Sequence, residues 1–223
     1  MTAPLLVFDL DGTLVDSATD LILTLNRLLE REAIPPVALA DARHLVGAGV
    51  KPLLARALAQ QGADSSDANV DRLYVTYLEL YTIHMVDESR PFPGVITALD
   101  RFEAAGWRFA VCTNKLESLS RLMLDRLGLT QRFAAVCGAD TFPVRKPHAD
   151  HLLGTIAAAG GDRTRAVMVG DSAADIDVAR NAAVPSVGVT FGYTPVPVAA
   201  LNPGVVIDHY DELWEAVARL GVR

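Results

Sequence analysis

The chain has 223 residues, and its 20 Lys and Arg residues stand against 27 Asp and Glu residues, which gives a formal net charge of −7. Nucleic acids and membrane surfaces are bound by basic faces, so this acidity argues against both as partners. Hydrophobic residues make up 51% of the chain and charged residues 21%, which excludes the disordered class and provides for a large core. An anionic substrate would therefore depend on local cations.

Six short apolar runs have the composition of strands, beginning with PLLVFD near the N-terminus. Between most of them lie stretches in which apolar residues return every three or four positions, as in helices. This alternation predicts an α/β fold with a Rossmann-like parallel sheet, covered by helices on both faces. The predicted strands span residues 4–9, 107–112, 133–137, 166–170, 185–189 and 205–208.

One long segment, residues 17–88, interrupts the alternation and contains no convincing strand. We expect it to form an inserted helical cap domain, while residues 1–16 and 89–223 form the α/β catalytic core. The proline-rich turn PFPG follows the far boundary. The helices expected in the insert span about residues 17–32, 38–45, 51–61 and 67–84.

The cysteines and the apolar segments indicate the cellular compartment of the protein. Cys112 and Cys137 each lie in an apolar run, which favours two buried thiols in a reducing environment over a disulfide framework. The N-terminus lacks the basic region of a secretory signal. Residues 181–207 carry no charge, but repeated proline and glycine residues argue against a membrane-spanning helix. We therefore expect a cytoplasmic protein.

Polar side chains follow several of the predicted strands, where parallel sheets place their ligand sites. Carboxylates gathered there would repel one another by about 4 kcal/mol per pair at 4 Å and an effective dielectric near 20. A hard dication removes that repulsion, and Mg²⁺ suits carboxylate ligands and a phosphate oxygen. The residues at these positions are Asp9, Asp11, Gly12, Thr113, Asn114, Lys115, Lys146, Asp171 and Asp175.

A phosphate site can be read from the same positions. Gly12 has no side chain, so the backbone amides of its loop can approach an anion closely. Lys146 and the hydroxyl of Thr113 would complete the cradle. Taken alone, Asp9 and Asp11 could also be an ordinary Asp-Gly turn after a strand.

Four sequence motifs resemble those of the haloacid dehalogenase superfamily, in the same order along the chain. They are VFDLDGTLVDS, VCTNK, RKP and VGDSAADID. The helical insert after the first motif looks like the small α-helical cap of that superfamily. Further segments resemble the corresponding segments of bacterial phosphoglycolate phosphatases. They are GADTFPVRKP, the FGY at residues 191–193 and the closing VIDHYDEL.

The resemblance implies roles for individual residues. Asp9 would be the nucleophile that forms an aspartyl-phosphate, and Asp11 the general acid and then the general base. Asp9 and Asp171 would bind Mg²⁺ by side chain and Asp11 by its backbone carbonyl. Asp175 would contact these ligands and not the ion itself. Thr113, Asn114 and Lys146, with the Gly12 loop, would hold the phosphoryl oxygens.

The implied reaction is hydrolysis of a small acidic phosphate ester, 2-phosphoglycolate first, by a monomer or homodimer. Another phosphoryl-transfer enzyme of the superfamily, namely a sugar phosphatase, a pyrophosphatase or a β-phosphoglucomutase-like isomerase, would use the same core residues. A catalytically silent binding protein on this fold is a third hypothesis.

Two segments leave further alternatives. In the insert, Gly47 and Gly49 permit a close-approaching loop, and Arg43 and Lys51 could meet a substrate carboxylate or be ordinary surface charges beside a turn. After Lys146-Pro147 the chain has His148-Ala149 where such phosphatases commonly have Asp-Pro. There we expect Asp150 to cap the next helix.

Overall fold

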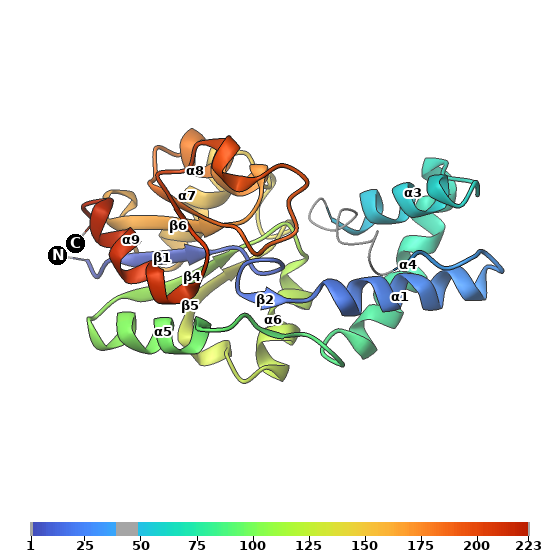
Figure 1. Ribbon diagram of the computed structural model, residues 1–223, viewed down its shortest axis with the longest axis horizontal. Coiled ribbons are helices and arrows are strands. Elements are labelled where there is room, and N and C mark those ends of the chain that lie inside the picture. The colour runs from blue at the N-terminus through green and yellow to red at the C-terminus, as the bar shows by residue number, and fades with distance from the viewer. Residues whose placement is uncertain (1, 39–48, 223) are drawn as a thin grey trace. The chain divides into compact units, whose positions relative to one another are not determined.

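The computed structural model of the protein describes residues 2–38 and 49–222. The chain divides into two compact units (Figure 1). The first comprises Met1–Asp16 and Pro91–Arg223, and the second comprises Ser17–Arg90. The first unit is therefore assembled from two chain segments that are far apart in the sequence.

A six-stranded sheet forms the centre of the first unit, with the strand order β5-β4-β1-β6-β7-β8. Every neighbouring pair is parallel, which confirms the predicted Rossmann-like α/β fold. The strands are β1 Leu5–Phe8, β4 Arg108–Cys112, β5 Phe133–Cys137, β6 Ala166–Gly170, β7 Ser186–Val189 and β8 Val205–Ile207.

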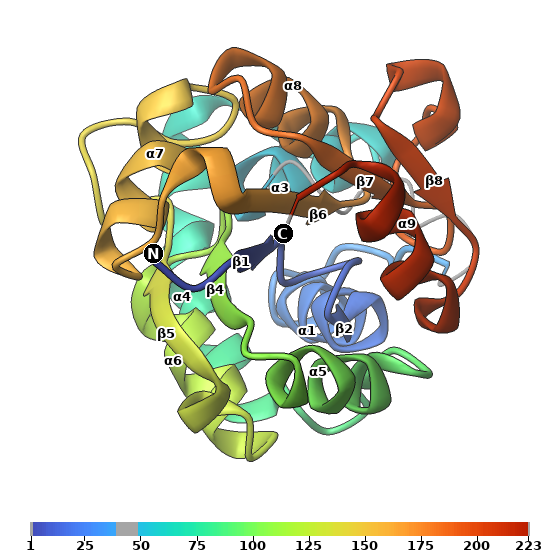
Figure 2. The same ribbon diagram turned by 90° about the vertical axis from the view of Figure 1, so that its left-hand side faces the viewer.

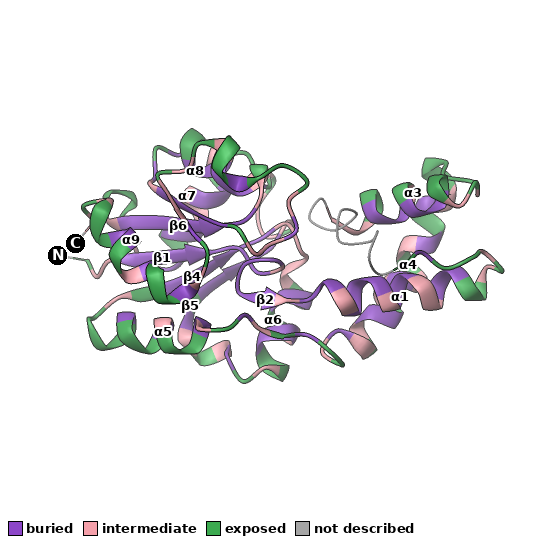
Figure 3. Ribbon diagram, in the orientation of Figure 1, coloured by how far each residue is buried: buried purple, intermediate pink, exposed green. Residues whose placement is uncertain are grey.

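Burial on both faces explains why these strands are nearly continuous apolar runs. All four residues of β1 and all five of β6 are buried (Figure 3). Phe8 at the end of β1 lies in register with Val111 of β4 and with Val169 of β6. The residues that follow these three strands therefore emerge at one edge of the sheet.

Helices cover the two faces of the sheet. Figure 2 shows α7 and α8 on one side of the strands and α5 and α9 on the other. Under α7 lies an apolar core that includes Leu5, Val7, Cys112, Leu152 and Ile156. The helices of this unit are α5 Val95–Ala104, α6 Glu117–Arg126, α7 Ala149–Ala158, α8 Ala173–Asn181 and α9 Leu213–Arg219.

The second unit is helical in its described part. It contains α1 Ala18–Arg31, α3 Val50–Gln60 and α4 Asp67–His84, close to three of the expected helices. The fourth, expected at 38–45, lies almost wholly outside the described residues. Within the unit, α1 packs on α4, and the buried Tyr77 hydroxyl donates to the Leu21 carbonyl at 3.0 Å.

Short elements were not expected from the sequence. Two-residue strands β2 Val15–Asp16 and β3 Arg90–Pro91 pair at the two points where the chain passes between the units. Single 3₁₀ turns are η2 Thr130–Arg132, η3 Arg163–Arg165, η4 Val198–Leu201 and η5 Tyr210–Glu212. Among the described helices, none is long and apolar enough to cross a membrane.

The start of α7 corrects one expectation. The ring nitrogen Nδ1 of His148 accepts a hydrogen bond from the Asp150 amide at 3.2 Å, so the capping residue is His148 and not Asp150. Asp150 lies in the first helical turn, where its charge favours the helix dipole instead. The helix start therefore survives the absence of the Asp-Pro pair.

Candidate active site

The carboxyl ends of β1, β4 and β6 bring the predicted site residues together in the first unit. Asp9 follows β1, Thr113 follows β4 and Asp171 follows β6, and these strands are neighbours in the sheet. All three side chains lie at the level where the apolar strands end. The site is therefore built on the most rigid part of the fold, and the loops supply the remaining groups.

Asp9 and Lys146 form a buried ion pair. The Nζ atom of Lys146 lies 2.9 Å from Oδ1 of Asp9, and the Lys146 side chain is 1% exposed. The same Nζ lies 2.6 Å from Oδ1 of Asp175. One ammonium group thus bridges two carboxylates, while the Leu10 amide donates to Oδ1 of Asp9 at 2.7 Å.

Asp171 is held at both of its oxygens. The hydroxyl of Thr13 donates to Oδ1 at 2.9 Å, and the backbone amide of Tyr193 donates to Oδ2 at 2.9 Å. The carboxylate of Asp175 is also engaged, because the amide and the hydroxyl of Ser172 donate to its Oδ2 at 3.0 and 2.6 Å. The orientation of both carboxylates is therefore fixed by neighbours on three loops.

The carboxylates of this cluster carry more negative charge than Lys146 alone balances, and the pKa values reflect this. Burial raises the pKa of Asp9 to about 6, against the opposing charge of Lys146, and the charge of Asp175 adds to the rise. Burial and the charges of Asp175 and Asp9 raise the pKa of Asp171 to about 8. Burial alone would lower the pKa of Lys146, but the charges of Asp175 and Asp9 outweigh it and raise that pKa above its ordinary value.

The donor set fits a hard divalent metal ion. Asp9, Asp171 and Asp175 each offer a carboxylate oxygen, and these oxygens lie within 4.8 Å of one another. A single Lys146 cannot neutralise three buried carboxylates, so the cluster must take up either a proton or a cation. Oxygen donors of this kind are the preferred ligands of Mg²⁺.

Gly12 lies so close to the carboxylate cluster that the side chain of any other residue would clash there. Its φ is +82°, and a Cβ built there would lie 2.7 Å from Oδ2 of Asp171. Its amide donates to the Val15 carbonyl at 3.0 Å, so this N–H closes the turn instead of facing an anion. Phosphate binding by the backbone amides of this loop stays a prediction, in which the amides beside Gly12 would be the donors.

Thr113 and Asn114 lie beside this cluster. The Thr113 hydroxyl hydrogen-bonds to Asp9 and accepts from the Lys115 amide at 3.3 Å. The side-chain amide of Asn114 donates to the Lys146 carbonyl at 3.2 Å, and its buried Oδ1 has no hydrogen-bond partner in the part of the chain that the structure describes. Asn114 therefore ties the loop after β4 to the loop that carries Lys146.

Sequence reasoning assigned no role to three contributors to the site. Lys115 forms an ion pair with Asp11, with its Nζ 3.0 Å from Oδ2. Thr13 and Tyr193 orient Asp171, as described above. Lys115 stands in the polar run after β4 and Tyr193 in the FGY segment, so both could be noticed, but nothing in the sequence reveals the partner of either side chain.

The candidate specificity residues of the insert are placed only in part. Arg43 and Gly47 lie outside the described residues. Gly49 precedes α3 with φ +97°, and a Cβ there would have no neighbour within 4 Å among the described residues. Lys51 is half exposed, pairs with Asp71 at 2.6 Å and lies over the Tyr74 ring.

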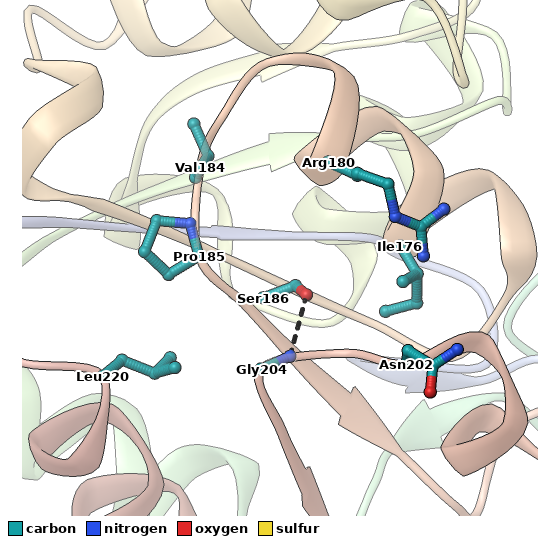
Figure 4. A pocket seen from close by; sticks show the side chains of 8 residues that line it. All are labelled: Ile176, Arg180, Val184, Pro185, Ser186, Asn202, Gly204 and Leu220. Carbon is teal, nitrogen blue, oxygen red and sulfur yellow. Dashed lines mark hydrogen bonds between the residues drawn. The ribbon is translucent and has the colours of Figure 1, made fainter.

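A separate pocket of about 270 Å³ lies in the first unit, lined by residues that include Arg180, Ser186, Asn202, Gly204 and Leu220 (Figure 4). Ser186 begins β7 and Gly204 precedes β8, so the pocket lies at the amino ends of these strands. The site carboxylates follow the carboxyl ends of β1 and β6, at the opposite edge of the sheet. The pocket is therefore not part of the candidate active site.

Comparison with known proteins places this arrangement in a family. Residues 6–189 match the family of haloacid dehalogenase-like hydrolases. The match includes the strand ends that carry the carboxylates and Lys146. The chain therefore belongs to the haloacid dehalogenase-like hydrolases.

More specific relatives are phosphatases. A phosphoglycolate phosphatase from Agrobacterium fabrum is 51% identical, over 96% of this chain and 92% of the relative. One from Mesorhizobium japonicum is 47% identical, over 100% and 98%. The crystal structure of a predicted phosphoglycolate phosphatase from Haemophilus somnus matches with a TM-score of 0.88 at 28% identity, covering 97% and 99% of the two chains. Within its family the chain is thus an enzyme of the phosphatase type.

Proposed function

We propose that the protein is a Mg²⁺-dependent phosphatase that hydrolyses a small acidic phosphate ester, with 2-phosphoglycolate as the preferred substrate. The observation that carries the proposal is the buried cluster in which Asp9, Asp171 and Asp175 lie within 4.8 Å beside Lys146. The names of the relatives support the substrate. In this proposal Asp9 and Asp171 bind the ion by their side chains, Asp11 by its carbonyl, and Asp175 supports them through Lys146 and Ser172.

The bound ion would supply charge neutralisation for the carboxylates and for the phosphate oxygens. The chemistry itself belongs to the protein. An oxygen of Asp9 forms a bond to phosphorus as the ester oxygen leaves, and Asp11 gives that oxygen its proton. Asp11 then takes a proton from water, whose oxygen attacks phosphorus and releases phosphate, so that Asp9 is regenerated.

The remaining residues would bind and orient the phosphoryl group. Lys146 and the Thr113 hydroxyl already contact Asp9, so they are within reach of oxygens on a phosphorus bonded to it. Asn114 keeps the Lys146 loop in place, and Gly12 allows the first loop to lie against Asp171. Such donors, fixed before the substrate arrives, stabilise the charge that develops during transfer.

The second unit would act as the cap domain of a cytoplasmic enzyme. We keep the segment from Arg43 to Lys51, with Gly47 and Gly49, as its proposed specificity determinant. Replacing Arg43 or Lys51 with Ala should lower activity on phosphoglycolate more than on p-nitrophenyl phosphate, which lacks a carboxylate. Equal losses on both substrates would remove the loop from this role.

The proposal is tested by comparing kcat/KM across a panel of phosphate esters, since this ratio measures discrimination between substrates. The panel contains phosphoglycolate, a sugar phosphate, inorganic pyrophosphate and p-nitrophenyl phosphate. We expect the highest value for phosphoglycolate, no turnover after chelation and recovery with Mg²⁺. A higher kcat/KM for pyrophosphate or a sugar phosphate would show that the enzyme is a pyrophosphatase or a sugar phosphatase instead. If the enzyme turned over none of the esters, the phosphatase proposal would be wrong.

A further inference from the structure

Lys115 and Asp11 form a two-point contact at the edge of the candidate active site. Nζ of Lys115 donates to both carboxylate oxygens of Asp11, at 3.1 and 3.0 Å. The Lys115 side chain is 7% exposed and that of Asp11 is 18% exposed. A part-buried ion pair of this kind is screened less than an exposed one, so it restrains the two side chains.

The backbone of Lys115 is fixed from two sides. Its amide donates to the Thr113 hydroxyl, and its carbonyl accepts from the Ala139 amide at 2.9 Å in the loop after β5. Gly138 packs against the same carbonyl so closely that a Cβ there would lie 2.6 Å from it. The ammonium group of Lys115 is thus presented from a backbone that has little freedom.

Asp11 lies in the turn after β1. Gly12 closes this turn by donating to the Val15 carbonyl, and Asp11 bridges to Val15. The side chain of an aspartate can rotate about two bonds, and proton transfer requires it within hydrogen-bond distance of the reacting oxygen. A contact to both oxygens fixes that rotation.

We propose that Lys115 is a positioning residue for proton transfer, which holds the Asp11 carboxylate toward the ester oxygen of the substrate. This inference rests on the proposed function, because it needs Asp11 to be the proton donor. Lys115 does not have to touch the substrate in this role. It differs from Lys146, which contacts the nucleophile and the buried carboxylates.

The test uses a series of substituted phenyl phosphates with Mg²⁺, from p-nitrophenyl phosphate to phenyl phosphate. Nitrophenolate leaves readily without a proton, whereas phenolate is a poorer leaving group that benefits from one. For Lys115→Met we expect kcat/KM to fall about 10-fold or more on phenyl phosphate, since general acid catalysis contributes about 10² to 10⁴. The fall on p-nitrophenyl phosphate should be several times smaller.

Two further variants separate positioning from a structural effect. Lys115→Arg keeps the charge and two donors, so it should restore part of the activity on phenyl phosphate. Arg121→Met is the matched control, because Arg121 pairs with Glu117 on α6 close by but lies far more exposed. It should leave the dependence on the leaving group unchanged. If thermal unfolding shows that Lys115→Met does not fold, Lys115→Gln takes its place.

A double-mutant cycle shows whether Lys115 acts through Asp11. In an Asp11→Asn background, Lys115→Met should not change the ratio of the two kcat/KM values any further. Equal losses across the phenyl series, or a weaker dependence on the leaving group, would overturn the inference. A loss confined to phosphoglycolate would also overturn it and make Lys115 a carboxylate-binding residue. Failure of the wild-type enzyme on every ester would instead contradict the proposed function.

Discussion

Lys146 shows how a single side chain determines the electrostatics of this site. Its ammonium group lies between Asp9 and Asp175, almost fully out of solvent. Charges buried in this way need a partner, because the cost of leaving an ion unpaired in the interior is several kcal/mol. With three carboxylates for one ammonium group, the site retains an excess of negative charge. That excess is what a divalent cation would neutralise.

Gly12 provides a prediction at the scale of one residue. Gly12→Ala adds a methyl group that would meet Oδ2 of Asp171 at 2.7 Å, at a φ of +82° that alanine adopts reluctantly. The positive φ alone costs about 1 to 2 kcal/mol. We expect a larger loss than this in the free energy of unfolding, measured by chemical denaturation, together with a loss of at least 10-fold in kcat.

Gly106→Ala is the matched control for this substitution. Gly106 has a φ of +80°, and a Cβ there would have no neighbour within 4 Å in residues 2–38 and 49–222. Its replacement should cost only the conformational term of about 1 to 2 kcal/mol and leave kcat unchanged. If both variants lose the same free energy of unfolding and keep full activity, the close approach of Gly12 to Asp171 does not matter for function.

At the scale of elements, parallel strands explain how residues from distant parts of the sequence meet. Asp9, Thr113 and Asp171 could be predicted to converge, because each follows an apolar run and parallel strands end at one edge. The partner of each side chain could not be predicted. Lys115 reaches Asp11 rather than solvent, and this depends on β4 lying next to β1, which no local pattern encodes.

Short elements escaped prediction for a related reason. The strands β2 and β3 have two residues each, too few for an alternating pattern. They form only because these two distant segments of the chain pair with each other. The 3₁₀ turns are similarly short. His148 caps α7 although histidine is not among the residues that sequence rules favour, because its ring nitrogen reaches the Asp150 amide.

The start of α1 leads to a prediction for the second unit. Asp20 is 1% exposed, and its carboxylate accepts from the amides of Glu88 and Ser89 and from the Ser89 hydroxyl, at 2.6 to 3.1 Å. Asp20→Ala would leave these donors without a partner. We expect the free energy of unfolding to fall by about 2 kcal/mol or more, since hydrogen bonds to charged groups are worth about 1.5 to 3 kcal/mol.

Thermal unfolding measures this effect, and Asp71→Ala is the matched control. Asp71 belongs to the same unit and forms an ion pair with Lys51, but both side chains are more than half exposed. Exposed pairs contribute little to stability. A melting temperature that falls equally in both variants, or in neither, would mean that Asp20 does not clamp the two segments.

On the scale of the whole molecule, the net charge of −7 includes the site itself. Asp9, Asp11, Asp171 and Asp175 are four of the 27 acidic residues, gathered at one edge of the sheet. Lys146, Lys115 and a divalent cation would together balance these four carboxylates, which would allow an acidic protein to bind an acidic substrate there. The overall charge still argues against nucleic acid as a partner.

The buried carboxylates predict how stability depends on pH in the absence of metal. Asp171 has its pKa raised to about 8, above its unfolded value of 3.8, so between these values the folded state binds more protons than the unfolded state. Stability must then fall as the pH rises. From pH 6.5 to 8 we expect a loss of about 1 to 2 kcal/mol, measured by denaturation with chelator present.

Two comparisons make this measurement specific. Asp171→Asn imitates the protonated carboxyl group, so this variant should lose less stability over the same interval. Because Mg²⁺ competes with protons for the carboxylates, added Mg²⁺ should stabilise the wild-type protein more at pH 8 than at pH 6.5. Stability that stays constant or rises from pH 6.5 to 8 without metal would contradict the excess of buried negative charge.

If Asp9 is the nucleophile of a Mg²⁺-dependent phosphatase, as we propose, turnover passes through a phosphorylated Asp9. The most direct test is rapid acid quenching during turnover of radiolabelled phosphoglycolate, followed by digestion and identification of the labelled peptide. We predict a transient label on the peptide that contains Asp9, and neither label nor turnover in a folded Asp9→Asn variant. Turnover without any protein-bound label, a label on another residue, or an active Asp9→Asn variant would contradict the claim.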